Sequence, residues 1–180
     1  ERRALVASER LTPAEPPGAG PGAPMFEVRL GHPLFGEVLV DGMSPLRLDD
    51  WRRRLAGASE AEPTLAPDEV LRVATWRAAT GDHGNPLLLL QGAQRALVLG
   101  DVTLGERLAR SAHRARSTAA SAELLAGALL ALGRLDEALG VWRDATATAE
   151  LPGTPVERAL LATGLADALA WGLGEPEEAR

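Results

Sequence analysis

The chain has 180 residues, a net charge of −6 and no cysteine, lysine, isoleucine or tyrosine. The missing cysteine excludes a disulfide framework, a thiol nucleophile and a zinc ribbon, and no apolar run reaches the roughly 18 residues of a membrane-spanning helix. The acidic balance argues against a nucleic-acid-binding surface.

Both ends of the chain point to a segment of a longer protein. It begins at Glu1 without a methionine or a basic signal sequence. It stops at Arg180, in what reads as an unfinished helix. We therefore expect a fragment of a larger cytoplasmic protein, long enough for one sizeable core or two small ones.

The first predicted elements are two strands separated by a long loop. Residues 4–7 form a short apolar run, and Phe26, Val28 and Leu30 alternate with charged residues, which is typical of a half-buried strand. The stretch 12–24 between them contains five prolines and three glycines and is predicted to be a loop. Two such strands form a hairpin like the wing of a winged-helix fold.

Helices are predicted to follow, with starts marked by prolines. The first covers residues 33–40, and the second begins at Pro45 after Ser44, which is a good N-cap. Residues 56–66 are predicted to be a linker. A third helix opens at Pro67 and ends in the glycine-rich turn 81–85.

The rest of the chain is predicted to consist of helix hairpins that repeat. Leu-Gly pairs stand at 99–100, 132–133 and 173–174, and a small residue follows each glycine by five positions, namely Gly105, Ala138 and Ala179. A small side chain there lets two antiparallel helices approach closely. The unit 132–145 resembles a tetratricopeptide repeat, so residues 86–180 are interpreted as about two and a half repeats of an α-solenoid.

The predicted fold class is therefore mainly α. It consists of an α-solenoid of tetratricopeptide-like helix hairpins, preceded by a small winged-helix-like α+β segment with one β-hairpin. We place the end of the winged-helix-like segment in residues 1–60 and a helical-repeat arm in residues 61–180. The arm carries 11 arginines against 16 acidic residues, which makes DNA a poor ligand for it.

Few residues suggest chemistry. His32, His83 and His113 lie on different predicted elements without the spacing of a metal site, and His83 and His113 are expected to be exposed to solvent. The Pro/Gly stretch 17–22 is not a phosphate loop, because proline interrupts its backbone donors and no helix follows. The run 52–54, the one cluster of arginines, is predicted to be a solvated helix face beside two aspartates. We expect no catalysis and no metal site in this segment.

One residue string resembles a known family. Residues 28–39 (VRLGHPLFGEVL), followed by 43–47 (MSPLR), resemble the His-Pro-Leu region of large LuxR-type transcriptional regulators with an N-terminal STAND-class ATPase. In that family this region closes the winged-helix part of the ATPase module. An arginine-rich helix and a helical-repeat arm follow, and residues 71–77 resemble the first arm helix.

The resemblance implies a regulatory role within a larger protein. The parent would bind ATP or ADP through an upstream P-loop and DNA through a C-terminal helix-turn-helix. The arm between them would sense a small effector, contact another protein or mediate self-association, and the segment before it would contact the ATPase core of the same chain. By itself the segment would neither hydrolyse ATP nor contact DNA or a membrane.

The resemblance also implies one binding residue. In related STAND proteins a winged-helix histidine reaches the nucleotide phosphates in the resting state, and His32 matches it. The alternative is that His32 only caps the helix that begins at Pro33.

Two other functions stay open from the sequence. A stand-alone tetratricopeptide-type adaptor, whose groove would hold a peptide, explains residues 132–145 equally well. It leaves the hairpin and the His-Pro-Leu helix unexplained. An all-helical enzyme has only scattered carboxylates in its favour.

Overall fold

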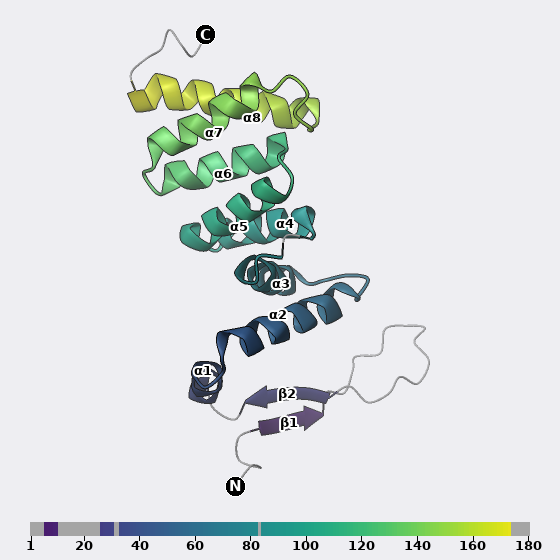
Figure 1. Ribbon diagram of the computed structural model, residues 1–180. Helices are drawn as coiled ribbons and strands as arrows, with labels where there is room; N and C mark the ends of the chain where they lie inside the picture. The colour runs from purple at the N-terminus through teal and green to yellow at the C-terminus, as the bar shows by residue number, and fades with distance from the viewer. Residues whose placement is uncertain (1–5, 11–25, 31–32, 83, 174–180) are drawn as a thin grey trace. The chain divides into compact units, whose positions relative to one another are not determined.

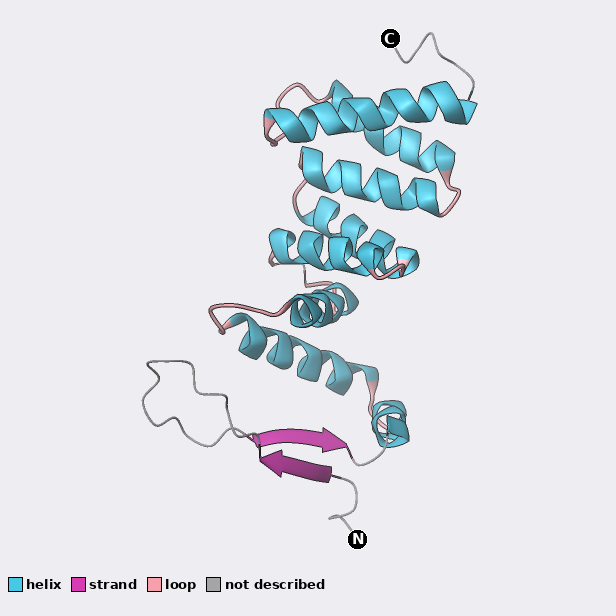
Figure 2. Cartoon of the chain, turned by 180° about the vertical axis from the view of Figure 1, so that it is seen from behind, coloured by secondary structure: helices cyan, strands magenta, loops and turns pink. Residues whose placement is uncertain are grey.

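The computed structural model describes residues 6–10, 26–30, 33–82 and 84–173. The chain divides into two compact units, residues 1–48 and 49–180. The division falls inside helix α2 (Pro45–Glu60), earlier than the boundary after residue 60 that we expected. The described part of the chain is mainly helical (Figures 1 and 2).

The first unit contains two strands and a short helix. Strands β1 (Val6–Arg10) and β2 (Phe26–Leu30) pair antiparallel, with Val6 opposite Leu30. Helix α1 (Pro33–Asp41) follows β2 and contacts it. The predicted loop 12–24 lies between the strands and outside the described residues. A strand pair and one helix do not by themselves define a winged helix, so the winged-helix part of the expected fold stays a proposal.

Helix α2 is longer than the sequence suggested. The predicted linker 56–66 is wrong in its first half, because the helix continues to Glu60 and Ala56 is fully buried. The end of α2 is held by Arg77, whose Nη2 lies 2.6 Å from Glu60 Oε2 and whose Nη1 donates to Asp82. The contact with Glu60 is distant in sequence, and the local pattern of Gly57 and Ser59 gave no sign of it.

The second unit contains the end of α2 and six further helices. These are α3 (Pro67–Ala79), α4 (Pro86–Val98), α5 (Val102–Ala115), α6 (Ala119–Ala131), α7 (Leu135–Ala147) and α8 (Pro155–Asp167). A short π-helical stretch, η2 (Ala168–Leu173), extends α8. The helix starts follow from local chemistry. In α4, α5, α6 and α8, the N-cap side chain accepts a hydrogen bond from the third helical N–H.

The turns that end α4 and α6 are alike. Gly100 and Gly133 have φ values of 81° and 73°, a left-handed conformation that favours glycine. After α4, Gly100 N donates to Leu97 O and Asp101 N donates to Ala96 O, both at 3.0 Å. The same pair of bonds follows α6, so both helices end in a Schellman motif. The turn after α3 has the same two hydrogen bonds and a positive φ at Gly81. The series of glycine turns therefore begins one helix earlier than the sequence pattern predicted.

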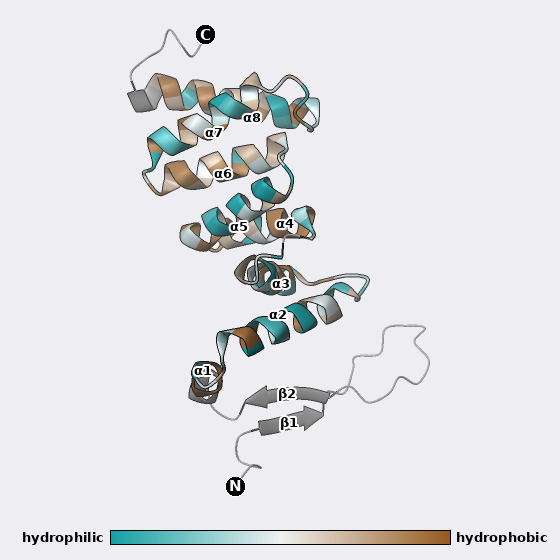
Figure 3. Cartoon of the chain, viewed as in Figure 1, coloured by the Kyte–Doolittle hydropathy of each residue, from teal (hydrophilic) through white to brown (hydrophobic). Residues whose placement is uncertain are grey.

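Consecutive helices pack against each other and alternate between two layers. Helix α3 contacts α5, while α4 contacts α6 and α6 contacts α8. Figures 1 and 2 show this stacking from two sides. The core between the layers includes Leu89, Leu108, Leu129, Leu139 and Trp142, all nearly inaccessible to solvent. Helix α6 is apolar along most of its length (Figure 3), as a helix covered by neighbours should be. The predicted mainly helical, solenoid-like fold is therefore confirmed.

Small residues allow the close approach of neighbouring helices, as the repeat pattern predicted. A Cβ atom on Gly105 of α5 would lie 2.6 Å from Leu97 Cδ2 of α4, and Ala138 of α7 is fully buried. Ala179, the third residue of the pattern, lies outside the described residues. Gly92 of α4 plays the same part against Ala74 of α3, although no motif singled it out.

An ion-pair cluster joins α5 to α7. Glu106 is 7% exposed and accepts hydrogen bonds from Arg110 Nε at 2.7 Å and from Arg134 Nη1 at 3.4 Å. Arg134 also donates to Glu137, with Nε 2.6 Å from Oε1. Two arginines thus neutralise the buried carboxylate of Glu106, which satisfies the requirement that a buried charge be paired.

The arginine run of α2 forms the polar face that we expected. Arg52 pairs with Asp49 at 3.2 Å and Arg54 with Asp50 at 3.9 Å. The Arg54 guanidinium also lies 4.9 Å from the centre of the Trp51 ring. Within the described residues, no helix combines the length and the apolar character that crossing a bilayer requires.

Candidate functional site

Of the three histidines, the structure describes only His113. His32, which the family resemblance implicates in phosphate binding, lies outside the described residues, and so does His83. His113 is described, and our expectation that it is exposed is wrong. The ring is half buried at the end of α5, and Nδ1 lies 3.0 Å from Ser121 Oγ at the start of α6.

The His113–Ser121 pair ties two helices together and does not resemble a nucleophile with its base. Ser121 is 2% exposed, accepts from Thr118 N at 3.0 Å and lies 3.2 Å from the Arg116 carbonyl to which it can donate. These bonds occupy the hydroxyl within a capping box. Burial, followed by the nearby Arg110 charge, lowers the pKa of His113, which favours the neutral ring.

The best candidate for a binding site is an open groove across α4, α6 and α8. Three cavities of about 440, 360 and 490 Å³ lie along these helices. Ala120 and Glu157 line both the first and the second cavity, and Glu123 and Gly127 line both the second and the third. These shared residues place the cavities next to one another along α6, and each has the volume of an ordinary ligand site.

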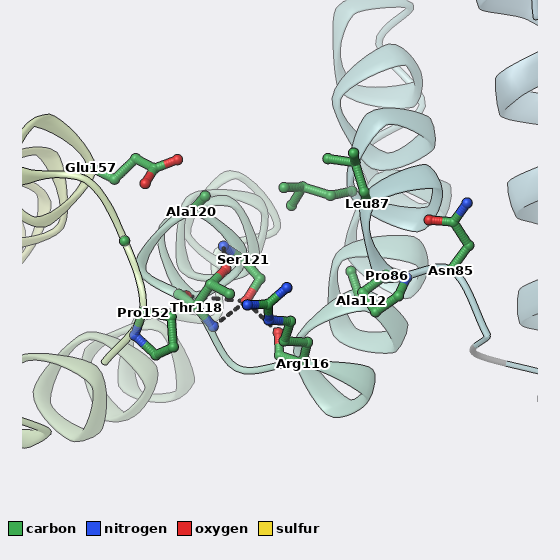
Figure 4. A pocket seen from close by; sticks show the side chains of 12 residues that line it. Asn85, Pro86, Leu87, Ala112, Arg116, Thr118, Ala120, Ser121, Pro152 and Glu157 are labelled. Atoms are coloured by element: carbon green, nitrogen blue, oxygen red, sulfur yellow. Dashed lines mark hydrogen bonds between the residues drawn. The ribbon is translucent and has the colours of Figure 1, made fainter. Parts of the chain in front are cut away.

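The first cavity lies where α4, α6 and α8 begin (Figure 4). Asn85 and Thr118, the N-caps of α4 and α6, line it, together with Gly153 before α8. Arg116 and Glu157 also line it and bring opposite charges to its wall. The Glu157 carboxylate caps α8 by accepting from Thr154 N at 2.6 Å. Among the described residues no carboxylate pairs with the Arg116 guanidinium.

Glu123 is the central charged residue of the groove. Its Oε2 accepts from Trp142 Nε1 of α7 at 2.6 Å, and Gly164 of α8 faces it so closely that a Cβ there would lie 3.0 Å from both carboxylate oxygens. Burial raises the pKa of Glu123, and the Trp142 hydrogen bond offsets part of that effect. A second acid, Asp167, lines the third cavity with it.

Each of the three groove helices leaves one leucine exposed along the cavities. Leu87 of α4 is 62% exposed, Leu130 of α6 is 43% exposed and Leu160 of α8 is 55% exposed. They line the first, third and second cavity respectively. Exposed apolar side chains that gather in a concave surface are typical of a binding site.

Our sequence analysis did not identify these groove residues. One signal was present, because Glu123 is the one charged residue within 119–131. The placement of Leu87 and Leu160 beside neighbouring cavities depends on helix packing and has no local signature. In chemical terms the groove offers apolar contacts, carboxylates and one arginine, which suit binding. Within the described residues no group of three His, Cys, Asp or Glu side chains is placed to hold a metal ion.

Comparisons with protein-family models, with curated proteins and with solved structures find no match to this chain.

Proposed function

We propose that this chain is a non-catalytic regulatory segment of an ATP-dependent LuxR-family transcriptional regulator. In this proposal residues 1–60 end a winged-helix-like part of the nucleotide-switch module. Residues 61–180 form the arm, which binds an effector or a protein. The segment acts in the cytoplasm and transmits changes between the bound nucleotide and the arm.

The order of elements supports this proposal most directly. The paired strands β1 and β2 come first, α1 begins at the Pro33 of the His-Pro-Leu string, and α2 carries the arginine run. A stack of two-layered helices follows from α3 onward. This is the order that the resemblance implies, and an isolated repeat protein has no need of β1, β2 and α1.

The surface of α1 supports the same proposal. Val38, Leu39 and Val40 are consecutive and all exposed, by 69%, 48% and 44%. Three adjacent exposed apolar side chains on one short helix are unfavourable in water and fit a surface that another part of a larger protein covers. In the proposal that part is the ATPase core.

The test uses the full-length protein that contains this segment. We expect its reading frame to encode a Walker motif upstream and a helix-turn-helix downstream. We also expect amide hydrogen exchange over residues 26–48 to speed up when ATP replaces ADP, because nucleotide exchange releases the winged-helix contact. A reading frame that encodes neither the Walker motif nor the helix-turn-helix would contradict the proposal.

His32 has its own test in the same protein. If its side chain contacts the nucleotide phosphates, His32→Ala accelerates ADP release, whereas Arg53→Ala on the exposed face of α2 leaves the rate unchanged. Equal ADP release from the wild type and from His32→Ala would contradict the phosphate contact and leave capping of the Pro33 helix as the alternative.

A stand-alone protein-interaction adaptor is a second candidate, and the groove across α4, α6 and α8 favours it. Such a groove suits a peptide ligand whether or not an ATPase is attached. The full reading frame separates the two candidates, because the adaptor predicts neither a Walker motif nor a helix-turn-helix.

A further inference from the structure

We infer that the groove across α4, α6 and α8 binds a peptide segment of a partner protein, with a basic side chain between apolar ones. The basic side chain would meet Glu123, and the apolar ones would cover the exposed leucines. This inference rests on the binding role proposed for the arm and specifies the chemistry of its partner.

The apolar part of the argument comes from Leu87, Leu130 and Leu160. They stand on three different helices and are all more than two-fifths exposed. The cavities beside them follow one another along α6, so we expect a single extended or helical segment to contact all three leucines. Covering them removes apolar surface from water, which is the general driving force of such docking.

The charges decide what else the segment carries. The side chains that line the three cavities include the acids Glu123, Glu157 and Asp167 and one base, Arg116. The acidic majority favours a cationic segment. Because Arg116 lies at the first cavity and Asp167 at the third, an acidic group on the segment would lie at the first cavity, where α4, α6 and α8 begin.

Glu123 is the residue best placed to recognise the basic side chain. The Trp142 indole N–H occupies one of its oxygens, fixes the carboxylate and leaves Oε1 with acceptor capacity. The carboxylate lines both the second and the third cavity, where Gly127 and Gly164 contribute no side chain. Burial raises the pKa of Glu123, so the ionised form gains from a cationic partner that replaces lost water.

The experiment selects peptides with the whole 180-residue chain as bait, from a displayed library of random 12-residue peptides. We expect the selected peptides to share a lysine or arginine flanked by apolar residues. Their affinities for the chain are then measured by isothermal titration calorimetry at two salt concentrations, with weaker binding expected at high salt.

Two groove variants and one control locate the site. Glu123→Gln keeps an oxygen for the Trp142 N–H but removes the charge and the second acceptor oxygen, so we expect about tenfold weaker binding by a chain that still folds, as circular dichroism checks. Leu160→Ser is expected to weaken binding similarly through lost apolar contact. Asp136→Asn changes an exposed acid of α7 outside the groove and should leave the affinity unchanged.

Two outcomes of the selection overturn the inference: no peptide is selected, or the selected peptides are acidic. Two outcomes of the binding measurements also overturn it: Glu123→Gln binds the peptides as tightly as the wild type does, or Asp136→Asn lowers the affinity as much as Glu123→Gln does. Self-association of the chain that Leu160→Ser abolishes would also overturn it, because the occupant would then be a second copy. None of these results bears on the regulator proposal, which the full reading frame and the nucleotide experiment decide separately.

Discussion

Gly133 holds the backbone conformation that ends α6. Its φ of 73° is a left-handed backbone conformation that is unfavourable for a residue with a Cβ atom. A Cβ atom added there would have no other atom within 4 Å. A Gly133→Ala variant should therefore lose about 1 kcal/mol of unfolding free energy through backbone strain alone. Urea unfolding followed by circular dichroism measures the loss.

The matched control is Gly140→Ala, in the interior of α7, where a Cβ also meets nothing within 4 Å. Gly140 has no positive φ, so alanine should stabilise the chain by about 0.5–1 kcal/mol through helix propensity. If both variants shifted the stability in the same direction, the backbone explanation for Gly133 would be wrong.

Glu123 should make the stability depend on pH. Its pKa is raised in the folded chain by burial, so the folded state holds more protons than the unfolded state between the ordinary and the raised value. The unfolding free energy therefore falls as pH rises through that window. We expect Glu123→Gln to lack this fall, as measured by urea unfolding from about pH 4 to about pH 8.

The difference in unfolding free energy between wild type and Glu123→Gln isolates this contribution from that of other groups. His113, whose pKa is lowered, acts in the opposite sense in both proteins and cancels in the difference. A difference that stays constant over the whole pH range would contradict the buried environment of Glu123.

At this scale the sequence reveals residues whose role depends on their neighbours along the chain. Gly133 follows a leucine at a repeat position, and this alone predicts the turn. His113 was misjudged because its partner Ser121 belongs to the next helix, and the burial of both follows from packing of α5 against α6. Burial raises the pKa of Glu123, and its partner Trp142 stands 19 positions away, so no local pattern encodes that environment.

At the scale of elements, Glu106 of α5 is the buried acid in the ion pairs that join α5 to the start of α7. This carboxylate is 7% exposed and receives hydrogen bonds from Arg110 and Arg134. Glu106→Ala leaves both guanidinium groups without that acceptor. Because both arginines still reach solvent, we expect a loss of about 2 kcal/mol, less than for a fully buried pair.

The comparison variant is Asp50→Ala, which removes an exposed pair with Arg54. Exposed ion pairs contribute little, so its unfolding free energy should change by no more than about 0.5 kcal/mol. Chemical denaturation of both variants gives the two values. A loss for Glu106→Ala as small as that for Asp50→Ala would mean that the cluster does not hold α5 against α7.

Helix starts were better predicted than helix ends. Pro33, Pro45, Pro67 and Pro155 each open a helix as expected, because proline fits the first turn on local grounds. The end of α2 was misplaced because Arg77 of α3 anchors Glu60 from 17 positions away. The groove belongs to the same class, since it arises from the placement of α4, α6 and α8 beside one another.

At the scale of the whole molecule, the periodic glycines and leucines predict the repeat stack, but not which surfaces it leaves open. The groove lies across α4, α6 and α8, and the exposed apolar residues of α1 belong to the other compact unit. Whether a partner covers these surfaces depends on other chains or domains. This explains why the sequence indicates the architecture of the arm more directly than its ligand.

The two compact units should contribute unequally to stability, and two truncations test this. In a solenoid each repeat is stabilised by its neighbours. Removing residues 149–180 takes away Leu161 and Leu169, which are 2% and 3% exposed, and uncovers α6 and α7, which contact α8. We expect the unfolding free energy to fall by about 3–6 kcal/mol and apolar dye binding to rise.

Removing residues 1–43 leaves the second unit and the Ser44 that precedes α2 intact. Because this unit buries its own core, its main thermal transition should move by only a few degrees, whereas the C-terminal truncation lowers it by considerably more. Circular dichroism melts of the two truncated chains give the comparison. If loss of residues 1–43 destabilised the helices as much as loss of α8, residues 49–180 would not form a unit with its own core.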